Sequence, residues 1–293
     1  GVALWDKNAG GFHTTVARIS GKRGNTFSIT LPLHADLMMN DKAQAATVFP
    51  VISGYNLEGA IVENLTVDGS RDQNPSMDGC RGGGIFLYRA FGAIIRKCHV
   101  RNYNGDGISF QQSNDVRVVG CVSEGNAGLG LHPGSGSQRP VVEDCVARNN
   151  GSDGLFLCWR VRHGVFANNE LTGNGGHGIS IGHKDTDNVL RNNVVRGNSK
   201  NGIVFRNEAE PMAGHRNRLE DNRIEDNGGD GIFVNGETDG VVIRGNLIRD
   251  TRPAGAQTQR VAIRLGENAR KALIEKNDIG AEKELEDQRK GSK

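Results

Sequence analysis

Short apolar phrases recur along most of the chain, always in the same order. A glycine is followed by an aliphatic residue, any residue and a second apolar residue, which is the alternation of a short β-strand with one buried face. The phrase begins at Gly84, Gly107, Gly128, Gly154, Gly178, Gly202 and Gly231, with a degenerate copy at Ala262. Successive copies are 23, 21, 26, 24, 24, 29 and 31 residues apart. This period predicts a β-solenoid, in which no turn buries its apolar face without the next.

A second series of positions lies between these strands and carries amide or thiol side chains. Its members are Cys98, Cys121, Cys145, Asn169, Asn193, Asn222, Asn246 and Asn277. Stacked turns lie about 4.8 Å apart, so we expect parallel, in-register sheets and a ladder of asparagine amides. Stacked thiols point in the same direction, so the three cysteines are expected to be free and buried rather than bridged. A third series, Asn126, Asn150, Asn174, Asn198 and Asn227, precedes glycine-rich turns.

These patterns predict an all-β fold, a right-handed parallel β-helix of about 8–10 turns of roughly 24 residues. We expect a single domain over residues 1–280, with 1–50 as irregular N-terminal turns that continue the solenoid. Strands are expected at 27–30 and 46–49. The charged tail 281–293 is expected to be a capping helix or disordered. Two insertions, 69–82 and 207–216, interrupt the repeat.

Composition agrees with a fold that has many turns and a thin core. Glycine accounts for 42 of 293 residues, while hydrophobic residues make up 36% and aromatic residues 5%. Glycine does not recur at every third position, which excludes collagen. The sequence contains no run of 18 apolar residues, as a membrane-spanning helix would require. A net charge of +2 argues against a general nucleic-acid binder.

Candidate chemistry lies where outward-facing positions depart from the repeat. We expect one outward column to hold Tyr88, Gln111, His132, Cys158, Gly182 and Arg206, with Arg89, Trp159, Arg160, His183, Lys184 and Glu208 at the following turns. Cationic side chains can pair with the carboxylates of a substrate, and aromatic rings can stack on the faces of sugars. Imidazoles exchange protons near neutral pH. Each member alone also has a structural interpretation as a surface or turn residue. The aspartates before the repeat glycines, Asp106, Asp153 and Asp230, are interpreted as turn formers.

The region from Val62 to about Asp250 resembles the catalytic module of the secreted mannuronan C5-epimerases. More broadly, it resembles the parallel β-helix polysaccharide lyase and epimerase superfamily. The matching segments are Asn64–Asp72, Gly128–Pro133, Asp144–Ala147 and Asn149–Gly154, and the resemblance covers about two thirds of the chain. It implies a parallel β-helix, a groove for an anionic polysaccharide, and a secreted or periplasmic location.

The catalytic residues of that family are not carried over. His132 stands where the epimerase motif has aspartate, and Cys158 stands where the second catalytic aspartate would be. Gly134 and Ser135 replace the histidine and glutamate of the motif, and Leu129 replaces its tyrosine. The resemblance therefore extends to the groove rather than to epimerase chemistry.

The leading hypothesis is a polysaccharide lyase that removes the C5 proton of a uronic acid and eliminates the neighbouring oxygen. Arg206 and Arg160 would neutralise the carboxylate, Lys184 or His183 would be the base, and His132 the partner acid or second base. Substrate contacts are assigned to Tyr88, Arg89, Gln111, Trp159 and Glu208. The expected partner is a polysaccharide or oligosaccharide, with no nucleic acid, no membrane span and a monomeric chain.

Three alternatives stay open. A glycoside hydrolase would need two carboxylic acids, and only the strand-to-turn edge offers them, as Asp185, Asp187 and Glu208. A C5-epimerase-like enzyme and a non-catalytic glycan-binding solenoid are the other two. No cofactor is required by the sequence, although the same three carboxylates could bind Ca²⁺.

Overall fold

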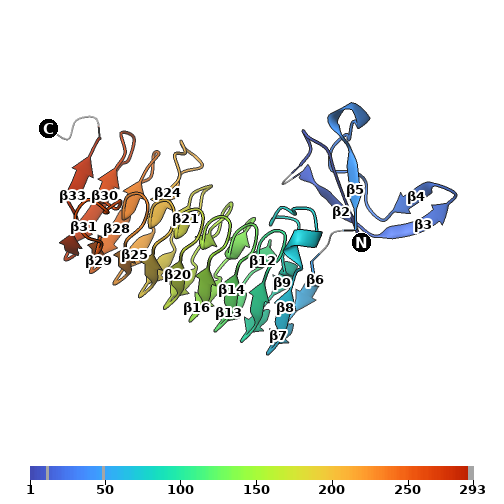
Figure 1. Ribbon diagram of the computed structural model, residues 1–293, viewed down its shortest axis with the longest axis horizontal. Coiled ribbons are helices and arrows are strands. Elements are labelled where there is room, and N and C mark those ends of the chain that lie inside the picture. The colour runs from blue at the N-terminus through green and yellow to red at the C-terminus, as the bar shows by residue number, and fades with distance from the viewer. Residues whose placement is uncertain (11–12, 48–49, 290–293) are drawn as a thin grey trace.

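The computed structural model describes residues 1–10, 13–47 and 50–289, and most of them form a right-handed parallel β-helix. Figure 1 shows its rungs following one another in chain order along the long axis, with the N-terminal strands at the end where β6 lies. The described residues contain no helix long and apolar enough to cross a membrane. Three parallel sheets of nine, nine and ten strands run the length of the solenoid, which confirms the predicted fold.

The ten-stranded sheet carries the candidate site and is called the site sheet. Its strands are β6 (Ile52–Glu58), β9 (Ile85–Phe91), β12 (Ile108–Gln111), β15 (Leu131–Gly134), β18 (Leu155–Phe156), β21 (Ile179–Ile181), β24 (Ile203–Phe205), β27 (Ile232–Val234), β30 (Val261–Leu265) and β33 (Lys283–Asp287). The inward column Ile85, Ile108, Leu131, Leu155 and Ile179 is buried and forms one wall of the core.

The other two sheets complete each rung. The second sheet comprises β7 (Ile61–Glu63), β10 (Ile94–Arg96), β13 (Arg117–Val119), β16 (Val141–Glu143), β19 (Val165–Ala167), β22 (Val189–Arg191), β25 (Arg218–Glu220), β28 (Val241–Arg244) and β31 (Ala272–Glu275). The third comprises β8 (Thr66–Asp68), β11 (His99–Arg101), β14 (Val122–Glu124), β17 (Val146–Arg148), β20 (Glu170–Thr172), β23 (Val194–Arg196), β26 (Arg223–Glu225), β29 (Leu247–Arg249) and β32 (Asp278–Gly280).

The predicted amide ladder is present at the turns between the second and third sheets. The Nδ2 group of Asn169 donates to Oδ1 of Asn193 at 3.0 Å, and the same contact continues through Asn222 and Asn246 to Asn277. The third series of asparagines forms a parallel ladder from Asn126 to Asn227, with amide contacts of 2.9–3.0 Å. Identical side chains at one repeat position therefore stabilise the stack with buried hydrogen bonds. All five cysteines are free, as expected for the stacked thiols.

One rung is out of register with the sequence-based alignment. The strand phrase expected at Gly128 begins at Gly130 instead, because Leu131 pairs with Ile108 and with Leu155. With Gly130 as the start of the phrase, the distance from Gly107 is 23 residues and the distance to Gly154 is 24, in place of 21 and 26. His132 consequently lies beside Ser109. The expectation that His132 shares a column with Gln111 and Cys158 was wrong by two residues.

Both ends differ from the expectations. The N-terminal strands β1 (Val2–Trp5), β2 (Thr15–Ala17) and β5 (Gln44–Ala46) form an antiparallel sheet, and β3 (Ile19–Arg23) pairs with β4 (Thr26–Ile29) as a hairpin. The segment therefore does not continue the solenoid, and the expected strand 46–49 lies partly outside the described residues. Single 3₁₀ turns occupy Met39–Asp41 and Arg71–Gln73. The tail adds β33 rather than a capping helix.

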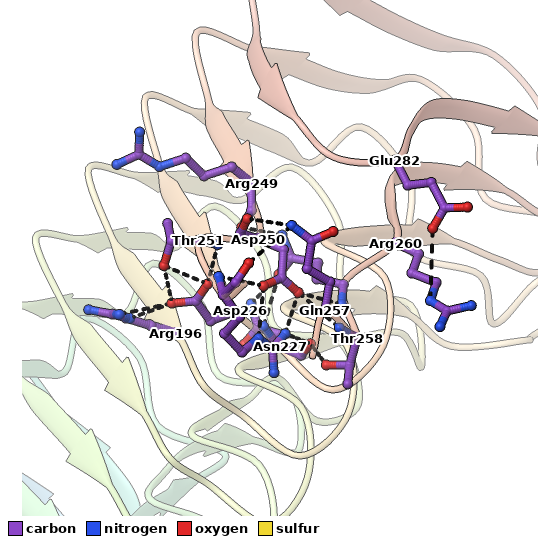
Figure 2. Close-up of polar contacts among 12 residues, drawn as sticks. Arg196, Asp226, Asn227, Arg249, Asp250, Thr251, Gln257, Thr258, Arg260 and Glu282 are labelled. Carbon is purple, nitrogen blue, oxygen red and sulfur yellow. Dashed lines mark hydrogen bonds and ion pairs between the residues drawn. The ribbon is translucent and has the colours of Figure 1, made fainter. Parts of the chain in front are cut away.

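A loop beyond β29 ends the ladder that runs from Asn126 to Asn227. Asp250 holds this loop by accepting the main-chain N–H group of Thr258 at 3.0 Å (Figure 2). It also accepts the main-chain N–H group of Gln259 at 2.9 Å. The side chain of Gln259 then accepts the amide of Asn227 at 2.7 Å. A glutamine from a longer turn thus ends this ladder.

Candidate functional site

Five successive rungs of the site sheet end in a residue with left-handed backbone geometry. These residues, called the rim, are Arg89, Gln112, Ser135, Trp159 and His183, with φ angles of 52°, 50°, 46°, 61° and 48°. Arg160 and Lys184 follow with φ of 71° and 67°. Left-handed geometry costs a residue other than glycine roughly 1–2 kcal/mol. The same geometry recurs at other turns of the solenoid, as at Asp144 and Asn168, so the rim is distinguished by its large aromatic and charged side chains and not by its backbone.

Four of the predicted site residues line one pocket beside the rim. Tyr88, Gln111, Trp159 and Arg160 surround a cavity of about 100 Å³ together with Cys80, Arg81, Gln112 and Ser135. The Arg160 guanidinium lies 5.8 Å from the Trp159 ring, and the Arg89 guanidinium lies 5.3 Å from the Tyr88 ring. Aromatic faces and cations thus alternate along this surface, which is called the shelf and comprises Tyr88, Arg89, Trp159 and Arg160.

His132 lies beneath this pocket and is not on the shelf. Only 3% of the residue is exposed, and its Nδ1 is 2.7 Å from Oδ2 of Asp106. The other oxygen of Asp106 accepts the main-chain N–H of Leu129 at 2.8 Å, which fixes the carboxylate. Burial lowers the pKa of His132, but its electrostatic interactions with Asp106 and Cys158 outweigh burial and raise that pKa to about 10. The Nε2 atom is buried and has no hydrogen-bond partner among the described residues.

Two cysteines from distant parts of the chain meet this imidazole. The donor atoms of Cys80, His132 and Cys158 all lie within 4.8 Å of one another. A hydrogen bond from Cys80 lowers the pKa of the Cys158 thiol against the effect of burial, and His132 and His183 lower it further. The same Cys158 contact, followed by burial, raises the pKa of Cys80. Among the described residues, this is the group of histidine, cysteine or acidic side chains placed to hold a metal ion.

Arg206 and Glu208 make internal contacts instead of facing the shelf. The guanidinium of Arg206 donates to Oγ of Ser180 and to the carbonyl of Leu157, both at 2.9 Å. It also lies 4.4 Å from the Phe156 ring centre. Glu208 is 2.8 Å from Nε2 of His183. Both side chains therefore position neighbouring groups, and neither is free to meet a substrate carboxylate or sugar in this arrangement.

The edge carboxylates do not converge either. Asp185 is fully buried and accepts the N–H groups of Val161 at 2.9 Å and Gly182 at 3.1 Å. Burial raises the pKa of Asp185 to about 7, although the nearby Arg206 charge opposes this. Asp187 forms a two-pronged ion pair with Arg216 at 2.6 and 2.8 Å. The three carboxylates therefore form neither a hydrolase pair nor a Ca²⁺ site in this arrangement, because each has its own structural partner.

Sequence reasoning missed three members of the buried cluster, namely Cys80, Asp106 and Cys158. Cys80 lies on the insertion before the first clean repeat, so no period connects it to a rung. Cys158 was placed on the outward face but given no role. The signal available in the sequence was that Cys158 replaces the small or polar residues that its column otherwise carries, such as Gly134 and Gly182.

Residues 63–269 match the NosD family, described as "Periplasmic copper-binding protein (NosD)". The chain belongs to this family. The match covers most of the solenoid and includes all five rim residues. Comparison with curated proteins finds no significant match.

Solved structures share the fold at low sequence identity. The Dettilon tailspike protein (gp208) superposes with a TM-score of 0.59 and 17% identity, covering 77% of this chain and 53% of that one. The periplasmic alginate epimerase AlgG gives a TM-score of 0.53 and 15% identity, covering 70% and 47%. This family member thus spans about half the length of those proteins. The likeness establishes the parallel β-helix.

Proposed function

We propose that the protein acts on an anionic polysaccharide that contains uronic acid, by proton abstraction at C5 and β-elimination. The observation that supports this most directly is the pocket beside the rim, where Tyr88, Gln111, Trp159 and Arg160 come together from separate rungs. The parallel β-helix shared with an alginate epimerase and a tailspike protein is consistent with action on carbohydrate. The family description supports a periplasmic location.

An extended sugar chain would lie along the shelf. Trp159, which is 38% exposed, offers a ring face for stacking, and Tyr88 offers a second one across the pocket. Arg160 is exposed beside Trp159 and pairs with the uronate carboxylate. A charge-assisted hydrogen bond of this kind is worth about 1.5–3 kcal/mol. Arg160 thereby takes the role of carboxylate neutraliser, because Arg206 is held by internal partners.

The proposed reaction is a balanced elimination. A base removes the C5 proton, the electron pair of that C–H bond forms the C4–C5 double bond, and the C4–O bond breaks. The leaving oxygen then takes a proton from an acid. We assign these two transfers to Lys184 and His183, which are adjacent at the rim, with the His183 ring 6.0 Å from that of Trp159. Neutralisation of the carboxylate by Arg160 makes the C5 proton more acidic.

The family description names copper, and the described residues include a matching set of donors. Thiolates and imidazole are the ligands that soft ions such as copper prefer, and Cys80, His132 and Cys158 supply both. The buried, unpartnered Nε2 of His132 fits such an ion. No step of the proposed elimination passes through a metal.

The test is to incubate the full chain with a panel of uronate-containing and neutral polysaccharides, following unsaturated-uronate absorbance and reducing ends together. Both signals rising together is the expected result. Reducing ends without absorbance would indicate hydrolysis and overturn the elimination. Binding with neither signal would point to an epimerase or a glycan-binding solenoid, and exchange of the C5 proton in heavy water separates those two.

Variants then test the assigned roles. Arg160→Gln should lower kcat/KM by about 10- to 100-fold, the loss expected for one charge-assisted contact. Lys184→Ala should abolish product while retaining binding. Arg191→Gln is the matched control, since Arg191 is an exposed arginine on β22 of the second sheet. Equal losses in Arg160→Gln and Arg191→Gln would show that the shelf is not the substrate site.

A further inference from the structure

We infer that Cys80, His132 and Cys158 form a binding site for a soft, thiophilic metal ion, Cu(I) or Zn(II), below the polysaccharide shelf. The inference rests on the buried donors themselves and is independent of the proposed lyase activity. The three donor atoms lie within 4.8 Å of one another, close enough to surround one ion. Metal–sulfur bonds of about 2.3 Å and metal–nitrogen bonds of about 2.0 Å require only a small contraction.

The imidazole is already oriented as a ligand. Nδ1 of His132 is 2.7 Å from the Asp106 carboxylate and donates to it, so Nε2 is the nitrogen that an ion would meet, and an ion that binds there displaces the Nε2 proton. Nε2 is buried without a partner among the described residues, which would be costly unless a ligand completes it. A carboxylate behind a histidine is the usual second layer of a metal site, where it fixes the tautomer and strengthens the donor.

A second buried atom without a partner faces the same space. The side-chain oxygen of Gln111 makes no hydrogen bond among the described residues, while its amide nitrogen donates to Ser109 at 2.9 Å. A Cβ on Gly134 would lie 2.6 Å from that oxygen and 3.0 Å from Nε2 of His132. Both unpartnered atoms thus border one small volume, which Gly134 keeps open. Gln111 can supply a weak fourth contact.

The site has a route to solvent and joins two parts of the chain. Cys80 and Gln111 both line the pocket that opens on the shelf, so an ion can enter from there. Cys80 belongs to the 69–82 insertion, whereas His132 and Cys158 belong to neighbouring rungs. A bound ion would therefore fasten the insertion to the solenoid. Three protein ligands leave a fourth position on the side of the pocket, where Gln111 lies.

The donor set favours a metal over two other uses of the same residues. A Cys158–His132–Asp106 nucleophile would need an exposed sulfur, but Cys158 is only 7% exposed and contacts a second thiol. A Cys80–Cys158 disulfide would leave Nε2 of His132 and the Gln111 oxygen without partners. A soft metal ion uses both thiols and Nε2 of His132 at once.

The experiment uses the full chain, reduced and stripped of metal. Cu(I) is titrated against bicinchoninate, Zn(II) against a chromophoric chelator, and Co(II) is added as a spectroscopic probe of thiolate ligation. We expect one equivalent of Cu(I) or Zn(II) to be withheld from its competitor, and thiolate-to-cobalt charge-transfer absorption. The ion that is retained against its competitor is one that the site binds. Failure to retain either ion, with reduced thiols, would overturn the inference.

Variants locate the site. Cys80→Ser and Cys158→Ser should each abolish retention, and Asp106→Asn should weaken it by about 10- to 100-fold while keeping one equivalent. Gly134→Ala should also block binding, because the added methyl occupies the ion's space. Cys121→Ser is the control, since Cys121 is buried in the ladder away from the cluster. Far-ultraviolet circular dichroism confirms folding, and loss of binding in Cys121→Ser equal to that in Cys158→Ser would refute the assignment. The cobalt spectrum of the unaltered chain counts thiolates even if a variant fails to fold.

Discussion

Replacing Asn193 by alanine should be among the most destabilising single changes on the solenoid outside the site. The amide is completely buried in the middle of the first ladder. Its oxygen accepts the main-chain N–H of Asn169 at 2.9 Å and the side-chain amide of Asn169 at 3.0 Å. Its nitrogen donates to the carbonyl of Phe166 at 3.0 Å and to Oδ1 of Asn222 at 2.9 Å. Alanine removes all of these contacts.

The magnitude follows from those contacts. Each hydrogen bond contributes about 1 kcal/mol net, and a buried donor left without a partner costs about 1–3 kcal/mol. Asn169 keeps one side-chain contact, to the carbonyl of Val142, but its main-chain N–H loses its partner. The four lost hydrogen bonds and the unpartnered N–H together lead us to expect Asn193→Ala to lower the free energy of unfolding by about 5–7 kcal/mol.

Urea unfolding followed by circular dichroism measures this loss, with the slope checked for a change in the unfolding unit. Asn207→Ala is the control, because Asn207 is exposed on the insertion and should shift stability by less than about 0.5 kcal/mol. A loss below about 1.5 kcal/mol for Asn193→Ala would show that water or a relaxed turn replaces the ladder contacts. Ladder hydrogen bonds would then be incidental to stacking.

Three further outcomes are expected. Burial raises the pKa of Asp250, but hydrogen bonds from Arg252 and from loop N–H groups more than offset this and hold it well below its usual range. The unaltered chain should therefore be more stable than Asp250→Asn near pH 7, and this difference should shrink as the pH falls below about 4. A difference in urea midpoint that stays constant down to about pH 2 would contradict this prediction. Gly202→Ala should cost about 1–3 kcal/mol in urea unfolding, because its Cβ would lie 2.5 Å from a side-chain carbon of Ile224. Trp159→Ala should weaken binding of the active polysaccharide, measured calorimetrically, with the melting temperature unchanged.

The architecture was predictable because its signals are local and repeated. A strand phrase near every 24 residues and an amide at a fixed offset describe one rung, and stacking follows from the need to bury its apolar face. Asn169 and Asn193 could be paired on paper for that reason. The N-terminal segment carries no repeat, so its antiparallel sheet around β1 could not be distinguished from irregular turns.

The candidate site was only partly predictable, and the errors have identifiable physical origins. Glycine is common at several positions of a rung, so the strand phrase could be aligned on Gly128 or on Gly130. Alignment on Gly128 was wrong, and it placed His132 beside Gln111 instead of beside Ser109. Hydrogen bonding within the protein also competes with exposure to solvent. Arg206 leaves the strand at an outward position, but the Leu157 carbonyl and Ser180 hydroxyl draw it back onto the sheet. Periodicity indicates which face a side chain leaves from, and local partners decide where its end group lies.

Asp106 shows how a functional residue can be hidden within a repeat. The interpretation of Asp106 and Asp153 as turn formers holds for one oxygen of each. Asp153 accepts the N–H of His177 one rung on at 2.6 Å, and Asp106 accepts that of Leu129 in the same way at 2.8 Å. The second oxygen of Asp106 is then available to His132, whose imidazole the next strand of the site sheet places beside it. The repeat supplies a fixed carboxylate, and a single substitution on the next strand gives it a chemical role, so the informative residue was His132 and not the aspartate.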